Sequence, residues 1–101
     1  MTREQCLEPR QAFLVEHYRP GRDVPQLSSS IARIRQIVAE MKRAGEPVRC
    51  LSATIVPNDE SFFCLIEAAS DEVVSDVYRR ADVPFERISA AICVLDEGES
   101  S

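Results

Sequence analysis

The chain has 101 residues and a formal net charge of -5 at pH 7, and 29% of its residues are charged. This length allows one domain with a modest core and excludes two. The negative balance argues against binding to nucleic acid or to an anionic membrane surface, because both need concentrated positive charge.

Neither a targeting segment nor a cysteine motif is expected. The first residues, MTREQCLEPRQ, have no apolar core of the kind found in signal peptides, and no later run has the length of a membrane span. The cysteines are spread without a CxxC pair, which argues against a zinc ribbon; they are Cys6, Cys50, Cys64 and Cys93. We therefore expect a cytoplasmic protein with reduced thiols.

Strand and helix patterns alternate in the order β-α-β-β-α-β. Residues 1–10 are polar and are expected to be flexible, residues 11–95 form the single domain, and the acidic tail 96–101 is expected to be disordered. Within the domain we expect a strand at 11–18, a helix at 25–44, strands at 48–56 and 61–68, a helix at 71–81 and a strand at 86–95.

Both helices show a continuous apolar stripe. The first has Asp23 or Val24 at its cap, and the second has Ser70. Their stripes consist of Leu27, Ile31, Ile34, Val38 and Met41 in the first helix and of Val73, Val74, Val77 and Ala81 in the second. Right-handed crossovers and a tight hairpin then favour an α+β ferredoxin-like sandwich, in which two helices cover one face of a four-stranded antiparallel sheet.

The PNDE loop sets the register of the central hairpin. If Val56 opposes Ser61, one face carries the pairs Ile55/Phe62, Ala53/Cys64 and Leu51/Ile66, which belong under the helices. The other face then carries Thr54/Phe63, Ser52/Leu65 and Cys50/Glu67, joined by Leu14 and Tyr18 of the first strand. This second face is partly apolar, so we expect a homodimer that packs sheet against sheet.

Two pairs of residues are candidate metal ligands. Glu16 and the single histidine, His17, are adjacent in a strand and so point to opposite faces; an exposed strand-end histidine beside a carboxylate paired with an arginine is the alternative interpretation. Cys50 and Glu67 are cross-strand neighbours in the register above. A thiolate, a carboxylate and an imidazole together suit nickel, copper or zinc.

The two pairs belong to opposite ends of the sheet. The first strand runs antiparallel to the third, so Glu67 lies far from His17 in one chain, and only a second copy can bring them together. Cys64 and Cys93 read as packing residues and Cys6 as an incidental thiol, whereas Asp59 and Glu60 are acidic turn residues near the His17 end.

Three segments resemble a known family. FLVEHYRPG, LSATIVPNDESFFCLIEAASDE and ADVPFERI together are similar to a family of small bacterial ferredoxin-like proteins of unknown function, some members of which are described as nickel-binding proteins. The resemblance implies a dimer that binds Ni2+ or another divalent metal, with Glu16, Asp59, Cys64 and Glu67 at motif positions. The chain departs from the family at Asp82, where a left-handed helix end favours glycine.

The leading hypothesis is therefore a dimeric cytoplasmic binding protein with a metal held by some of His17, Glu16, Cys50 and Glu67. The alternative is a small-molecule binder or an enzyme similar to cofactor-free monooxygenases, with a pocket between sheet and helices lined by Phe13, Ile34, Val38 and Phe62. The sequence does not decide whether the chain is an enzyme; it favours a binding protein, with no catalytic residues identified.

Overall fold

The computed structural model describes residues 11–92. The strands are β1 (Ala12–Tyr18), β2 (Arg49–Val56), β3 (Ser61–Glu67) and β4 (Arg87–Ala91), the helices are α2 (Val24–Arg43) and α3 (Asp71–Ala81), and a short 3-10 turn, η1 (Pro57–Asp59), follows β2. The expectations for segment 1–10, tail 96–101, Cys6 and Cys93 lie outside the described residues, as does the end of the strand predicted at 86–95.

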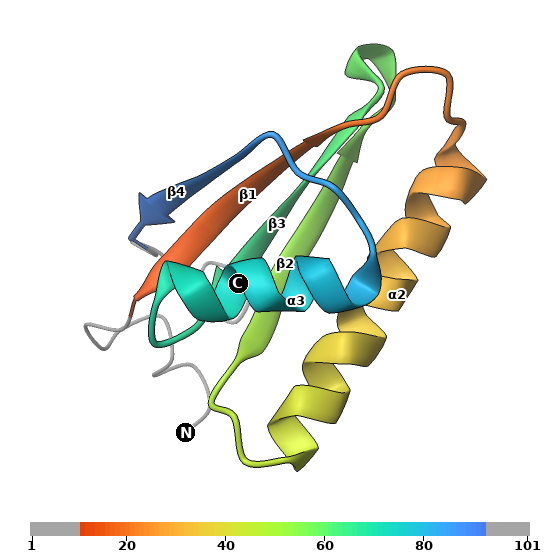
Figure 1. The fold of residues 1–101 in the computed structure, drawn as a ribbon. Helices are drawn as coiled ribbons and strands as arrows, with labels where there is room; N and C mark the ends of the chain where they lie inside the picture. The colour runs from red at the N-terminus through yellow and green to blue at the C-terminus, as the bar shows by residue number, and fades with distance from the viewer. Residues whose placement is uncertain (1–10, 93–101) are drawn as a thin grey trace, which may run out of the picture.

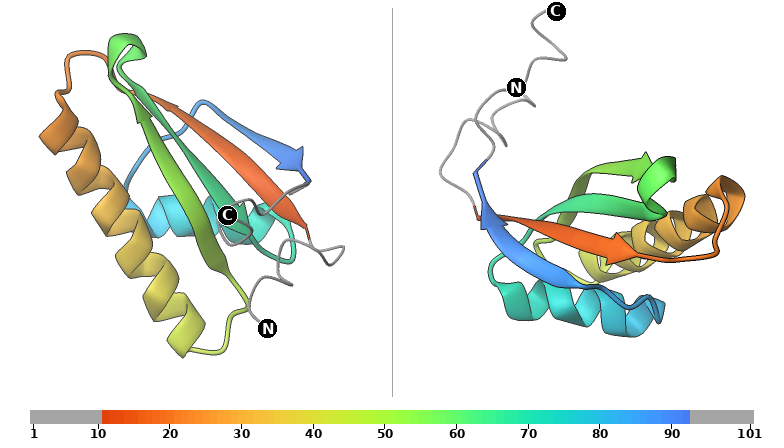
Figure 2. Two further views of the ribbon diagram at one scale, coloured as in Figure 1. Left: turned by 180° about the vertical axis from the view of Figure 1, so that it is seen from behind. Right: turned by 90° about the horizontal axis from the view of Figure 1, so that it is seen from above.

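The four strands form one antiparallel sheet in the order β2-β3-β1-β4. Both helices lie on the same face of this sheet, and α3 crosses over the strands while α2 runs along β2 (Figure 1). Neither helix covers the opposite face, which is turned to the viewer on the left of Figure 2. We call the two sides the helix face and the open face. The predicted ferredoxin-like arrangement is confirmed.

Helix α2 is defined at both ends by the predicted signals. The Asp23 side chain accepts a hydrogen bond from the Gln26 backbone, and the Gln26 side chain accepts one from the Asp23 backbone, which makes a capping box. Lys42 and Arg43 occupy the last turn, near the negative end of the helix dipole. Past this end, Gly45 adopts a φ of 98°, a conformation that is strained for other residues.

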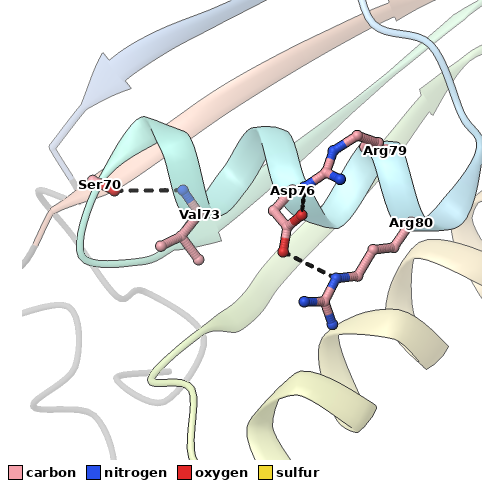
Figure 3. A network of polar contacts seen from close by, with 5 residues as sticks. All are labelled: Ser70, Val73, Asp76, Arg79 and Arg80. Carbon is pink, nitrogen blue, oxygen red and sulfur yellow. Dashed lines mark hydrogen bonds and ion pairs between the residues drawn. The ribbon is translucent and has the colours of Figure 1, made fainter.

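Helix α3 is shorter and more polar on its outer side. Ser70 caps it by accepting a hydrogen bond from the Val73 backbone, and Asp76 forms ion pairs with both Arg79 and Arg80 (Figure 3). The helix ends at Asp82, whose φ of 58° and ψ of 44° are left-handed. The departure noted in the sequence is therefore real: aspartate occupies a conformation that glycine adopts with less strain.

The hairpin register is as predicted over most of its length, from Val56/Ser61 to Ser52/Leu65. A β-bulge then intervenes at Leu51, so that Cys50 opposes Ile66 and Arg49 opposes Glu67. The predicted pairs Leu51/Ile66 and Cys50/Glu67 are wrong, because the extra residue of a bulge shifts every later pair by one position.

The core lies between the helix face and the two helices. Its buried residues come mainly from β1, α2, β3 and α3. Phe62, Cys64 and Ile66 of β3 are fully buried. The residues that β2 contributes to the predicted set are less buried, with Ala53 exposed and Ile55 half-buried, because β2 is an edge strand. In residues 11–92, no helix has the length and apolar character needed to cross a membrane.

Candidate functional site

Glu16 and His17 follow each other in β1 and lie on opposite faces of the sheet. His17 is 0% exposed on the helix face, as the alternation predicted, but the interpretation of it as an exposed strand-end histidine is wrong. It pairs with Phe62 across the sheet, so its ring lies on the buried row of β3. Tyr78 of α3 and Pro84, which follows this helix, lie against the His17 ring, and the sequence did not predict these contacts.

The His17 imidazole is held from two sides. Its ring stacks on Phe62, with centroids 4.1 Å apart and planes 12° apart, and is tilted against Tyr78 at 4.8 Å. Its Nδ1 lies 2.9 Å from the Pro84 carbonyl oxygen. Because a carbonyl oxygen only accepts, Nδ1 carries the proton and the lone pair of the neutral ring is on Nε2. Among the described residues, Nε2 is buried without a hydrogen-bond partner.

This environment keeps the ring neutral. Burial lowers the pKa of His17 from 6.5 to about 4, the hydrogen bond to Pro84 opposes that effect, and nearby Arg19 adds to it. A backbone carbonyl that fixes Nδ1–H and leaves Nε2 open is also the arrangement found behind many metal-bound histidines. Here, however, the rings packed against the imidazole are those of Phe62 and Tyr78, which supply no anionic ligand for a metal ion.

Glu16 lies on the open face and is paired with an arginine, as the alternative interpretation of the sequence predicted. Its Oε2 accepts hydrogen bonds from Arg87 at 2.7 Å and 3.0 Å. Beside it is a cleft of about 210 Å³ at the end of β1 and β3. The cleft contains three carboxylate residues together with neighbours of the two strands: Glu16, Asp59, Glu86, His17, Tyr18, Ser61 and Phe63. We call it the acidic cleft.

Glu67 lies at the opposite end of the sheet from His17, as predicted. It pairs with Ala12 in β1 and with Arg49 in β2, and is 5% exposed. With Lys42 and Pro47 it lines a cavity of about 360 Å³. The four predicted ligands are therefore not brought together within one chain.

Metal ligands do not converge within the described part of the chain. In residues 11–92, no group of three or more histidine, cysteine, aspartate or glutamate side chains is arranged so that it can hold a metal ion. The residues around the acidic cleft share a cavity without meeting at one point. Whether any of the predicted residues binds a metal stays a prediction.

The sequence did not predict the cluster that Cys50 joins. The bulge turns Cys50 to the helix face, where it packs against the core and its thiol contacts that of Cys64. The Tyr78 hydroxyl lies beside the Cys64 thiol without a hydrogen bond of good geometry. Tyr78 could have been found, since it is four residues after Val74 and thus lies on the same helical stripe.

The side chains proposed to line a substrate pocket have another role. Phe13, Ile34, Val38 and Phe62 all belong to the packed core between sheet and helices. The enzyme alternative stays a prediction.

Sheet order, helix placement and element order define the class of the protein as ferredoxin-like α+β. Residues 13–90 match the model of the family described as "Nickel responsive protein SCO4226-like", and the chain belongs to this family. The resemblance found in the sequence is thereby confirmed. A search of curated proteins found no match.

Proposed function

We propose that this chain binds Ni2+, or a divalent metal of similar ligand preference, at the acidic cleft, and that two copies complete the site. The observation that carries the proposal is the family match, which covers most of the chain and whose description names nickel responsiveness. The cytoplasmic location expected from the sequence belongs to the same proposal.

Access favours the acidic cleft over the buried histidine. Asp59 and Glu86 are exposed, and Glu16 is half-buried with one oxygen engaged by Arg87. A hydrated metal ion can reach these oxygens without disturbing the core. To reach Nε2 of His17 the ion must enter an aromatic pocket, where loss of its hydration is costly. For ligands of one kind, nickel binds more tightly than cobalt or manganese.

We propose a second copy because residues 11–92 of one chain provide too few converging ligands. The open face presents Leu14, which is 36% exposed, and Tyr18, which is 52% exposed, close to the acidic cleft. Burying these side chains against another open face favours association. In a two-fold dimer of this kind, the carboxylates of one cleft approach a site on the partner, which raises the number of ligands.

Titration with nickel by calorimetry tests the proposal. Glu16→Gln and Asp59→Asn each remove one charged ligand and keep the side-chain shape, so we expect each to weaken binding about tenfold or more, which corresponds to about 1.4 kcal/mol. Glu72→Gln is the matched control, since Glu72 is an exposed carboxylate of α3 remote from the cleft. It should leave the affinity unchanged.

His17→Phe distinguishes the two candidate ligand sets. The acidic cleft predicts wild-type nickel affinity for this variant, because the imidazole stays inside the core. Loss of binding in His17→Phe together with normal binding in Glu16→Gln would contradict the proposal. The dimer is measured separately by sedimentation of the metal-free and nickel-loaded chain, and Tyr18→Asp should shift it toward the monomer.

A further inference from the structure

Cys50 and Cys64 lie next to each other on the helix face although the regular register would separate them. Cys64 pairs with Ala53, while Cys50 pairs with Ile66 beyond the bulge at Leu51. The bulge places both cysteines on the same side of two neighbouring strands. They are diagonal neighbours, because the partner of Cys50 is Ile66, two residues after Cys64. Their side chains interact with each other, and the Cys50 thiol also donates a weak hydrogen bond to the Ser52 carbonyl at 3.7 Å.

The two thiols differ in how solvent reaches them. Cys64 is 0% exposed, whereas Cys50 is half-buried at the rim of the core. The interaction with the Cys64 thiol lowers the pKa of Cys50, burial opposes this effect, and the positive charge of Arg35 on α2 lowers the pKa further. The same interaction and burial raise the pKa of Cys64.

We propose that Cys50 and Cys64 form a redox-active pair, in which Cys50 reacts with a peroxide and Cys64 resolves the product to a disulfide. An accessible thiol that ionises readily, next to a second thiol, is the arrangement that oxidant-sensing cysteines share. Disulfides of reducing compartments are mostly transient ones of this type.

The reaction proceeds in two balanced steps. The Cys50 thiolate attacks one peroxide oxygen, the O–O bond breaks, and hydroxide leaves and is protonated to water; the sulfur becomes a sulfenic acid. Cys64 sulfur then attacks the Cys50 sulfur, the S–O bond breaks, and the Cys64 proton leaves with the hydroxyl group as a second water molecule. The peroxide is reduced and the two thiols are oxidised.

Closing the disulfide requires a small approach of the two backbones. Diagonal neighbours on adjacent strands have Cα atoms about 7–8 Å apart, which is longer than the usual span of about 4.4–6.8 Å across a disulfide. Strand β2 can supply this approach, because it is an edge strand and is bulged beside Cys50. The acidic cleft is on the other face, so this proposal does not depend on metal binding.

The experiment uses the full chain with Cys6→Ser and Cys93→Ser, which leaves only the two thiols of interest. The folded protein is treated with hydrogen peroxide, quenched, denatured and alkylated, and then cleaved after arginine. Cys50 and Cys64 then share one peptide, which runs from Cys50 to Arg79. We expect this peptide to lack two hydrogens and to carry no alkyl group.

Single variants assign the roles. In Cys64→Ala the reaction stops at sulfenic acid, so dimedone should label Cys50; in Cys50→Ala we expect labelling of Cys64 at least about tenfold slower. Recovery of both thiols reduced under conditions that label Cys50 in Cys64→Ala overturns the resolving role. Faster labelling of Cys64 than of Cys50 overturns the assignment. The disulfide measurement needs neither variant, so a folding defect in one of them leaves the test intact.

Discussion

Glu16 and His17 are one peptide bond apart, yet the two faces of the sheet give them opposite environments. On the open face, Glu16 is half-buried and forms an ion pair with Arg87. On the helix face, His17 is enclosed by Phe62 and Tyr78 and is held neutral. The same separation applies to the two proposals, since the carboxylates of the acidic cleft are on the open face and the thiol pair is on the helix face.

The comparison shows that the environment of a titratable group in this fold depends on the face of the sheet on which it lies. Its position in the sequence matters less. His17 and Cys64 on the helix face are cut off from water, so their uncharged forms are stabilised. Exposed residues of the open face, such as Tyr18, remain available to ions and to another chain. Chemistry that needs a charged ligand belongs on the open face.

The largest expected difference between the faces concerns packing. Phe62 is 0% exposed and stacks on His17, whereas its neighbour Phe63 is half-buried on the open face. We expect Phe62→Ala to lower the free energy of unfolding by about 3–5 kcal/mol and Phe63→Ala by about 1 kcal/mol. Urea unfolding of the two variants measures this. Equal losses would mean that the open face is buried to the same degree as the core.

A smaller effect follows from the neutral state of His17. Its pKa is 6.5 when unfolded and about 4 when folded, so protonation favours the unfolded chain. The contribution of neutral His17 to the free energy of unfolding is complete above pH 6.5 and is lost as the pH falls toward about 4, by about 3 kcal/mol in all. The variant His17→Phe has no imidazole and should not show this loss of stability.

The free energies of unfolding of wild type and His17→Phe are therefore compared from pH 7 to about pH 4. Carboxylates titrate in both proteins, so only the difference between the two curves reports on His17. The wild type should lose stability relative to the variant as the pH falls. Parallel curves would show that the imidazole is not desolvated.

The smallest effect concerns two left-handed residues. Asp82 and Glu60 have φ values of 58° and 53°. Asp82→Gly relieves this strain and keeps the hydrogen bond from Arg33 to the Asp82 carbonyl, so we expect a gain of about 0.5–1 kcal/mol. Glu60→Gly should gain less, because the Glu60 carboxylate accepts a bond from the Gly21 backbone. Thermal unfolding checks the order, and a loss of stability in Asp82→Gly would contradict it.

Most of the fold could be predicted because its signals are local. The Asp23 and Ser70 caps, the apolar stripes and the hairpin loop lie within a few residues of the elements they define. The family departure at Asp82 likewise predicted the left-handed helix end. Each of these depends on contacts over short sequence distances, where single-sequence patterns are informative.

The parts that failed depend on distant contacts. No glycine or proline marks the bulge at Leu51, so the true neighbours of Cys50 could not be predicted. The burial of His17 depends on the Pro84 carbonyl, 67 residues further along the chain. The candidate site is therefore known from the sequence only as a set of residue types, and its division between the two faces required the structure.

The protonation state of His17 tests most directly whether the two faces of the sheet give titratable groups different environments. Because the chain has a single histidine, the imidazole signals need no assignment. Nitrogen NMR of the imidazole as a function of pH reports both tautomer and pKa. We predict a neutral ring protonated at Nδ1 at pH 7, with a pKa of about 4. A ring that titrates near 6.5, as in an unfolded chain, would contradict the account.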